Sequence, residues 1–477
     1  MTDSAVVNET DVVIVGGGLS GLSAALMLKE TGTKFVLLEG KDRLGGRAHS
    51  MRSPFGIVDA GAEYIGTLQR TVWHYAQRLG VELFRTEIPS AMGWQFQGAD
   101  GKVRTFLPGD FPDAQQTMLA LGEVDELALL VRPYADRPED LPDFLKQLDQ
   151  ITIADWTPRS GPLSAATRDA FYASLRAVLS IEPSEASFLF LLHYAATAGG
   201  YSSLIDASGS GVGPEDYRFV GGTASLVDAF AAAVGAESIK LGDAVVRIES
   251  MPTFAQVTTA AGVVYRAKKV IAALGPWAFR ESHKPGIELC FEFDAADAEA
   301  GRRACTQRQA LCDGMHHGMS LKSFVRFRRP FWRDRNLQGR SLCASSASQP
   351  IAWTIDNSSD PSAAPAEEQV HSLLAFMAGD AAHVLLDASV ADRKAAVLAQ
   401  LVALFGEVAR DECLDYFDQP MPGPAGVLAK GVLSTVGSAL RRPVGRVHWA
   451  SSESALDWAG YMDGAIQAGL RAATEVL

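Results

Sequence analysis

Apolar and polar positions near the start of the chain follow two different periods. Residues 11–15 are almost continuously apolar, as in a buried strand, and from Leu19 to Lys29 apolar residues recur at helical spacing. A second apolar run occupies residues 35–38. The pattern therefore predicts a strand, a turn, a helix and a second strand, which is the βαβ unit of a parallel sheet.

The predicted turn contains three glycines with the spacing Gly16-x-Gly18-x-x-Gly21. Gly16 permits a tight turn, Gly18 keeps a Cβ out of a ligand's path, and Gly21 lets the helix pack closely on the strand. A helix N-terminus offers free N–H groups to a pyrophosphate. Glu39 ends the second strand, where a carboxylate can accept hydrogen bonds from ribose hydroxyls. Together these features predict a dinucleotide-binding unit.

The pattern changes further along the chain. Residues 86 to about 214 predict helices separated by proline-containing turns, with Ser184 as the N-cap of one of them. Strand-like runs return between residues 238 and 274, an amphipathic helix is predicted over residues 391–405, and a last helix is predicted from Met462. The dinucleotide-binding domain is therefore expected to be discontinuous.

We expect two domains within an α/β fold. The dinucleotide-binding domain is predicted to comprise residues 1–85, 215–285 and 420–477. A substrate-binding domain of mixed sheet and helices is predicted to comprise residues 86–214 and 286–419. A chain of 477 residues is long enough for two such units.

Composition and charge argue against several kinds of partner and binding site. The net charge of −13 argues against nucleic acid and against anionic membrane surfaces as partners. The first residues contain no signal peptide, and no segment is long and apolar enough to span a membrane, so we expect a soluble, cytoplasmic protein. Five cysteines without CxxC spacing predict free thiols, and neither a disulfide framework nor a metal site.

Several short motifs follow one another in a specific order. They are GGGLSGLSAA from residue 16, Glu39, RLGGR, DAGAEYIG, RFVGG, VIAALGP, LKSFVRFRRPFW and WAGYMDGAIQAG. In this order the chain resembles the flavin-containing amine oxidases, and within them the monoamine oxidases, from about residue 11 to the C-terminus. The resemblance implies a Rossmann-like FAD-binding domain of the GR2 type. Because the chain stops soon after the last helix, without the membrane tail of the animal enzymes, it is most similar to a soluble microbial or fungal type.

The resemblance also implies a reaction. A hydrophobic, primary amine, in its neutral form, would transfer a hydride to N5 of non-covalently bound FAD. The imine would hydrolyse to an aldehyde or ketone and ammonia, and O₂ would reoxidise the flavin and yield hydrogen peroxide. The expected partners are thus a small amine and O₂. A homodimer is compatible with the sequence, which leaves the oligomeric state open.

Site residues follow from the matched motifs. The residues expected to contact FAD are Gly16, Gly18, Ser20, Gly21, Glu39, Gly46, Arg47, Ala62, Glu63, Tyr64, Val245, Glu453, Tyr461 and Met462. Glu453 takes the acid position of the family's GTE signature, which here reads SSE. The N-terminus of the last helix would stabilise the negative charge of reduced flavin.

Two residues are expected to be catalytic. Lys322 matches the family's lysine that holds a water near flavin N5, although a lysine in an alternating strand usually faces solvent. Tyr461 matches one wall of an aromatic cage around the amine. Gly423 aligns with the family's cysteine that links FAD covalently, and Pro424 with the second cage aromatic. The second wall is therefore open, unless Tyr416, Phe417 or another aromatic residue replaces it.

The substrate pocket is predicted to be mostly apolar, with Ala177, Val178, Ile205, Trp353 and Pro424 among its residues. His193 is expected to pack within a helix, and residues 201–218 form either an entrance loop or a surface insertion.

Three alternative functions stay open. An amino-acid oxidase of the same superfamily would need a pocket arginine for the substrate carboxylate, and Arg326 shares the predicted strand face of Lys322. The second alternative is a biosynthetic flavin desaturase. The third is a non-catalytic binding protein, like the Rab escort proteins and the GDP-dissociation inhibitors.

Overall fold

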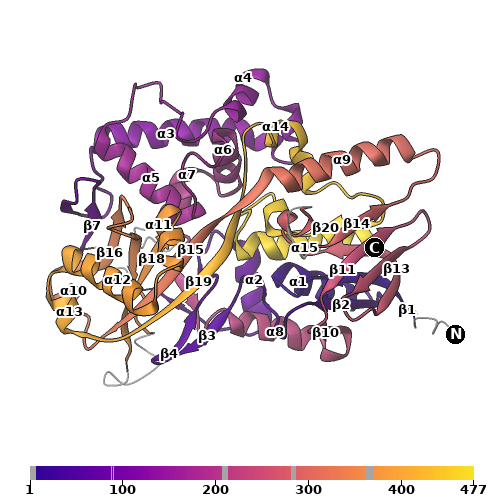
Figure 1. Ribbon diagram of the computed structural model, residues 1–477, viewed down its shortest axis with the longest axis horizontal. Helices are drawn as coiled ribbons and strands as arrows, with labels where there is room; N and C mark the ends of the chain where they lie inside the picture. The colour runs from indigo at the N-terminus through magenta and orange to yellow at the C-terminus, as the bar shows by residue number, and fades with distance from the viewer. Residues whose placement is uncertain (1–6, 87–88, 90, 207–212, 281–285, 360–368) are drawn as a thin grey trace.

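The computed structural model describes residues 7–86, 89, 91–206, 213–280, 286–359 and 369–477. Two large sheets organise these residues (Figure 1). The first sheet has the order β10 (Ile239–Leu241), β2 (Phe35–Glu39), β1 (Val7–Val15), β13 (Val264–Ala272), β12 (Ala255–Thr259), β11 (Val245–Ser250) and β14 (Glu288–Phe291), and β20 (Val447–Trp449) also pairs with β13. The second has the order β19 (Cys413–Leu428), β15 (Met315–Phe327), β18 (His371–Ala378), β17 (Ile351–Asp356), β16 (Leu337–Cys343), β7 (Gly93–Gln97) and β8 (Val103–Phe106).

The remaining elements surround these sheets. The longer helices are α1 (Leu19–Glu30), α2 (Arg70–Arg78), α3 (Ala114–Val131), α5 (Ala165–Leu179), α6 (Phe188–Thr197), α8 (Ala224–Val234), α9 (Ala298–Gly314), α12 (Val390–Phe405) and α15 (Met462–Val476). Shorter helices are α4 (Asp143–Lys146), α7 (Tyr201–Leu204), α10 (Phe331–Asp334), α11 (Asp380–Leu386), α13 (Val408–Asp411) and α14 (Leu433–Val436). Short strands are β3 (Ser50–Ser53), β4 (Gly56–Asp59), β5 (Tyr64–Ile65), β6 (Leu83–Arg85) and β9 (Tyr217–Phe219).

The predicted βαβ unit is confirmed. Strands β1 and β2 pair in parallel, with α1 between them in sequence. Strand β13 pairs in parallel with β1 and with β20, so segments from the start, the middle and the end of the chain share one sheet. Helix α15 begins at Met462, as predicted.

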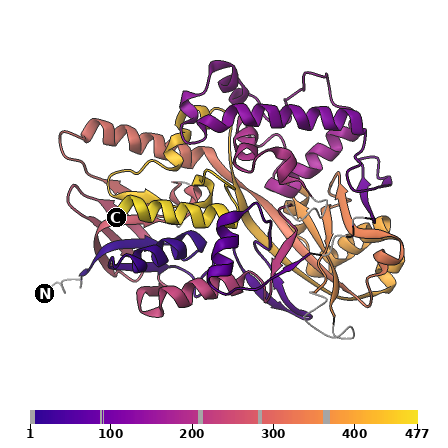
Figure 2. The same ribbon diagram turned by 180° about the vertical axis from the view of Figure 1, so that it is seen from behind.

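Helices α1 and α15 lie side by side in both views (Figures 1 and 2). A Cβ at Gly469 would come within 2.0 Å of the Ser20 carbonyl oxygen, so only glycine allows this approach. The contact places the N-terminal halves of both helices in one region of the first sheet, where the predicted cofactor residues are found.

The boundaries of the two domains remain a prediction. Strand β14, which comes from the predicted second domain, joins the first sheet. Strand β19 continues past residue 420 as part of the second sheet. Helices α3, α5 and α6 form a group beside the second sheet (Figures 1 and 2).

Helix α6 is buried along its whole length. Its N-cap is Ser187, whose Oγ accepts a hydrogen bond from the Phe190 N–H at 3.1 Å. The predicted N-cap, Ser184, was wrong by three residues. A helix that is buried on every side has no amphipathic boundary, so its first residue could not be read from periodicity.

His193 packs within α6, as expected, but burial of its imidazole costs free energy of folding. Its side chain is 3% exposed, and neither ring nitrogen has a hydrogen-bond partner among the described residues. Burial, together with the charges of Arg441 and Arg132, lowers the pKa of His193 to about 3. The imidazole is therefore neutral in the folded protein at any ordinary pH.

We expect His193 to make the folded protein acid-sensitive. Between about pH 6.5 and pH 3 the unfolded chain binds a proton here that the folded chain does not, so stability falls as the pH falls, by up to about 1.4 kcal/mol per pH unit. His193→Leu should show a smaller drop in thermal midpoint between pH 7 and pH 5 than the wild type. The exposed His383→Leu serves as control and should follow the wild type. Equal drops in all three proteins would contradict this account.

Candidate functional site

The three glycines of the predicted turn differ in the structural reason for which each position requires glycine. Gly16 has φ +107°, a conformation that side chains rarely adopt. A Cβ at Gly21 would lie 1.9 Å from the Gly16 carbonyl oxygen. A Cβ at Gly18, in contrast, would meet nothing closer than the Gly45 carbonyl oxygen at 3.9 Å. The protein itself leaves room beside Gly18, which fits a ligand that approaches the backbone there.

Two helix N-termini are buried without a side-chain cap in the described structure. Helix α1 starts after Gly18, and its first residues, from Leu19 to Gly21, are buried. Helix α15 starts after Tyr461, and Met462 to Gly464 are buried. Buried N–H groups at a helix start need partners. A phosphate suits the first helix and an electron-rich carbonyl or anion suits the second.

Asp463 does not cap its own helix. Its Oδ1 accepts a hydrogen bond from the Val72 N–H at 2.7 Å, and so it caps the start of α2. Burial raises the pKa of this carboxyl, although the backbone N–H groups of α2 counteract that effect. The positive end of α15 therefore keeps its N–H groups for another partner.

Glu39 and its neighbours lie where the sequence predicts the ribose end of the site. Glu39 Oε2 accepts a hydrogen bond from the Gly17 N–H at 2.7 Å, and Oε1 accepts one from the Lys41 N–H at 2.9 Å. Val245 follows Ala244, which packs on Gly40, so Val245 lies near Glu39. Gly46 lies against Gly18, with 3.4 Å from its would-be Cβ to the Gly18 Cα. The fold thus brings these predicted cofactor residues together.

Arg47 connects the N-terminal segment to the turn before α15. Its Nη1 donates to Glu453 Oε1 at 2.6 Å, and its Nη2 donates to Glu453 Oε2 at 3.2 Å and to Ser452 Oγ at 2.7 Å. Nη1 also donates to the Pro424 carbonyl oxygen at 3.3 Å. Burial alone would raise the pKa of Glu453, but the Arg47 guanidinium offsets it and holds that pKa below its usual value. The SSE turn is therefore fixed by a charged, bidentate pair.

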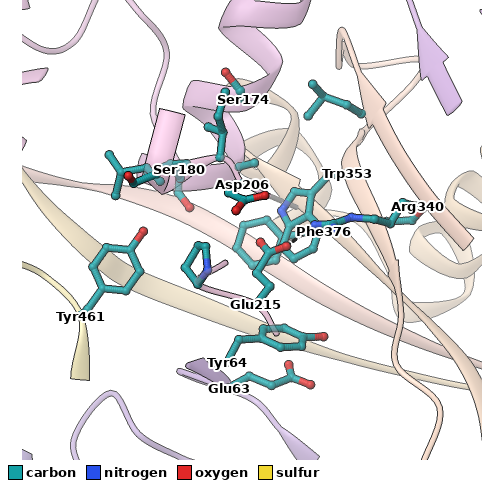
Figure 3. Close-up of a pocket in the computed structure, with 18 of the residues that line it drawn as sticks. Glu63, Tyr64, Ser174, Ser180, Asp206, Glu215, Arg340, Trp353, Phe376 and Tyr461 are labelled. Carbon is teal, nitrogen blue, oxygen red and sulfur yellow. Dashed lines mark hydrogen bonds and ion pairs between the residues drawn. The ribbon is translucent and has the colours of Figure 1, made fainter. Parts of the chain in front are cut away.

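A cavity of about 710 Å³ lies beyond the start of α15 (Figure 3). Eleven predicted site residues line it, namely Ala62, Glu63, Tyr64, Ala177, Val178, Ile205, Lys322, Trp353, Pro424, Tyr461 and Met462. The other predicted residues, Gly16, Gly18, Ser20, Gly21, Glu39, Gly46, Arg47, Val245 and Glu453, lie outside its lining. Part of the predicted entrance loop, residues 207–212, lies outside the described residues, whereas Ile205 and Glu215 on either side of it line the cavity.

Lys322 is buried and fully hydrogen-bonded. Its Nζ donates to the carbonyl oxygens of Asp59 at 2.9 Å and Gly61 at 2.8 Å, and to Glu63 Oε2 at 2.9 Å. An ammonium has three N–H donors, so each is used. To hold a water near a flavin, as its motif predicts, Lys322 would have to exchange one of these bonds. In this arrangement it fixes the segment that follows β4.

The aromatic cage is incomplete. Tyr461 has Tyr194 as its neighbour, with ring centroids 6.2 Å apart and a tilt of 32°. Neither Tyr416 nor Phe417, the substitutes left open by the sequence, lines the cavity. Tyr416 instead donates to Asp418, and Phe417 packs on Phe324. Gly423 has φ +71° and lies against His317.

The cavity arginine is not the predicted one. Arg326 pairs with Asp415 at 3.3 Å, with both side chains more than a third exposed, and it does not line the cavity. Arg340 on β16 does, and it pairs with Glu215. Sequence reasoning missed Arg340, Glu215 and Tyr194. Only an inward-facing charge on a strand could have indicated Arg340, and the short β16 shows no regular alternation.

Comparison with known proteins decides the family. A model of the family "Flavin containing amine oxidoreductase" matches residues 19–477. The chain belongs to this family. It is thus an oxidoreductase and a flavoprotein that uses FAD, of the monoamine oxidase type. The buried, uncapped helix ends and the open space at Gly18 fit that cofactor.

Two curated relatives and one solved structure illustrate the similarity. A probable flavin-containing monoamine oxidase A of Dictyostelium discoideum is 28% identical, over 98% of this chain and 97% of its own. An L-amino acid dehydrogenase of Synechocystis sp. is 30% identical, over 98% of this chain and 94% of its own. The cyclohexylamine oxidase structure from Brevibacterium oxydans IH-35A superposes with a TM-score of 0.84 at 26% identity, covering 98% of both chains. These matches confirm the predicted fold class.

None of the helices formed by the described residues is long and apolar enough to cross a membrane. The same residues contain no group of three or more His, Cys, Asp or Glu side chains placed to hold a metal ion.

Gly18→Ala should separate cofactor binding from folding. The backbone at Gly18 has φ −74° and its surroundings are open, so the thermal midpoint of the FAD-free protein should not change. The added methyl group should weaken FAD binding roughly tenfold or more, because it occupies the ligand's space. Gly21→Ala should instead lower the thermal midpoint of the FAD-free protein. Unchanged FAD affinity in Gly18→Ala, measured by absorbance after dialysis, would contradict this assignment.

Removing Lys322 should expose the cost of taking the nearest cation from a buried carboxylate. Lys322→Met leaves Glu63 with only the more distant Arg218 guanidinium, 3.9 Å away, and breaking such a buried pair costs about 3–5 kcal/mol. Lys322→Met combined with Glu63→Gln removes the charge and should recover part of the loss in thermal stability. If the double variant is no more stable than Lys322→Met, the pair does not carry this energy.

Proposed function

We propose that the protein oxidises a small amine with O₂ as the electron acceptor. The main observation behind this proposal is the cavity. It begins at Tyr461 and Met462, at the buried start of α15, and Lys322 forms part of its wall. Bound FAD would supply the hydride acceptor, with release of an imine that hydrolyses to a carbonyl compound and ammonia.

The side chains of the cavity support this proposal because they exclude water and can orient an amine. Apolar residues such as Leu121, Phe376 and Ala425 line it and keep water from the reacting carbon. Tyr461 presents a ring beside the start of α15, where it can orient the amine nitrogen. The N–H groups at the start of α15 would stabilise negative charge gained by the cofactor.

We also propose that FAD is bound without a covalent link. Gly423 stands at the position of the family's linking cysteine, and its backbone at φ +71° favours glycine. Of the five cysteines, Cys413 is the one within β19, and it is the first residue of that strand, well before Gly423.

Oxidation of an α-amino acid is the second candidate. It is supported by the similarity to an L-amino acid dehydrogenase and by the presence of an arginine, Arg340, in the cavity. An arginine can bind a carboxylate through two hydrogen bonds. Whether Arg340 lies in the right part of the cavity decides between the two candidates.

A peroxide-release screen tests the proposed function. Purified FAD-loaded protein is offered primary, secondary and polyamines, and L-amino acids, at saturating O₂. We expect peroxide with amines, and Lys322→Met should slow turnover at least tenfold, because the segment from Asp59 to Glu63 loses its anchor. Peroxide from amino acids alone would favour the second candidate, and oxidation of all substrates without any peroxide would show a different electron acceptor.

A further inference from the structure

Two tyrosines share the wall of the cavity at the start of α15. Tyr461 immediately precedes that helix, and Figure 3 shows its ring reaching into the cavity. Tyr194 comes from the buried helix α6, and both residues line the cavity. Tyr194 is only 5% exposed, so its side chain meets little besides the protein and this cavity.

The end of α6 fixes the position of the Tyr194 hydroxyl. The Thr197 carbonyl oxygen accepts a hydrogen bond from the Trp458 N–H at 2.9 Å, and Thr197 Oγ1 accepts one from the Ala459 N–H at 3.2 Å. A Cβ at Gly460 would lie 3.2 Å from Tyr194 Oη. Helix α6 therefore holds the segment before α15 and places the Tyr194 hydroxyl directly against that segment.

The Tyr461 ring is held by a second aromatic residue. Trp458 packs edge-on against it, with ring centroids 5.2 Å apart and an angle of 83° between the ring planes. Trp458 has φ +51°, in the left-handed region that residues other than glycine rarely adopt. Such a conformation persists only where the surrounding structure enforces it. Here it keeps the Tyr461 ring next to Tyr194.

The two hydroxyls have only each other as partners among the described residues. They interact through a side-chain hydrogen bond, and no other described residue hydrogen-bonds to either oxygen. A hydroxyl donates one hydrogen bond and accepts up to two. The bond between Tyr194 and Tyr461 uses one O–H and one lone pair. One donor and several acceptor positions therefore remain at the cavity wall.

Both hydroxyls stay protonated in the folded protein. Burial is the largest cause that raises the pKa of Tyr194 and of Tyr461 well above the ordinary value for tyrosine. The pair is therefore neutral at any working pH. Buried polar groups require hydrogen-bond partners, and a ligand with N–H groups supplies them here.

A nitrogen that carries hydrogen can use these acceptors, and a nitrogen that carries only carbon cannot. The N–H of a neutral amine donates to a phenol oxygen, while the nitrogen lone pair stays free to assist loss of hydride from the adjacent carbon. Two facing aromatic rings would also accept an N-methylated cation. In this chain, however, Pro424 stands where the second ring is expected. The wall therefore distinguishes amines by their N–H groups.

We propose that the Tyr194 and Tyr461 hydroxyls together bind the N–H groups of the substrate amine, so that the protein selects primary amines over N-alkylated ones. Tyr194 thereby replaces the missing second cage aromatic as the partner of Tyr461. This inference rests on the proposed amine oxidation, and it names the class of amine that the site accepts.

The test varies the nitrogen on one carbon skeleton. Hexylamine, N-methylhexylamine and N,N-dimethylhexylamine are assayed with the wild type and with Tyr194→Phe, and kcat and KM are measured separately. We expect Tyr194→Phe to lower kcat/KM about 3- to 10-fold for hexylamine, mainly through KM, and to leave it unchanged for the dimethyl amine, because only N–H groups lose a partner. The methyl groups add the same bulk in both proteins, so this difference isolates the hydrogen bond.

Tyr201→Phe is the matched control. Tyr201 is a buried tyrosine outside the cavity lining, and its hydroxyl lies 2.7 Å from Ser174 Oγ, so this change should leave the relative kcat/KM values of the three amines as they are in the wild type. If Tyr194→Phe does not fold, Tyr461→Phe removes the other hydroxyl of the pair and should show the same selective loss with hexylamine. A loss of kcat/KM that is equal for all three amines, or no loss, overturns the inference.

A binding measurement keeps the two proposals distinguishable. The shift in thermal midpoint of the FAD-loaded protein is recorded without O₂, with hexylamine and with N,N,N-trimethylhexylammonium, which has no N–H group. A larger shift with hexylamine that disappears in Tyr194→Phe supports the hydroxyl site even if no amine is oxidised, and in that case only the proposed function fails. An equal or larger shift with the trimethyl ion, or a difference that persists in Tyr194→Phe, overturns the inference irrespective of turnover.

Discussion

The requirement that buried backbone N–H groups find partners governs this molecule. Helices α1 and α15 both begin in buried surroundings, and no side chain caps either in the described structure. They are also packed on each other at Ser20 and Gly469, so their starts cannot move apart independently. The fold thus holds two sets of N–H donors for a ligand that spans both, which is what an FAD molecule with a pyrophosphate and a flavin ring can do.

A second constraint links the two sheets. Lys322 on β15 of the second sheet donates three hydrogen bonds to the segment from Asp59, the last residue of β4, to Glu63. Glu63 is held in turn by Asn357 at the end of β17. The cavity lies between these elements, so its shape depends on a buried charged pair rather than on apolar packing alone. We therefore regard Lys322 first as a positioning residue of the site.

Sequence patterns predicted those parts of the fold that depend on residues close together in the chain. The strand, glycine turn and helix up to Glu30, and the start of α15 at Met462, depend on spacings within a few residues. Motif order placed Lys322 and Tyr461 in the site, but could not show which groups Lys322 contacts. Those acceptors lie about 260 residues away in the chain, and only the folded structure brings them together.

Sequence reasoning failed where the position of a residue along its strand or helix decides whether it reaches the cavity. Alternation put Arg326 on the same face as Lys322, but a period of two fixes the face of a strand and not the point at which the cavity ends. Arg340 and Glu215 are 125 residues apart, and nothing in the local sequence joins them. In α6 every position is buried, so no pattern could show that Tyr194 faces Tyr461.

The central claim is that an amine bound in this cavity delivers electrons to FAD held at the two helix ends. An anaerobic titration of the purified, FAD-loaded protein with amine, followed through the flavin absorbance near 450 nm, tests this step without O₂. We expect the absorbance to bleach in proportion to the amine added and to return when air is admitted, with release of peroxide. Flavin that stays oxidised with every amine, although it is tightly bound, would contradict the account.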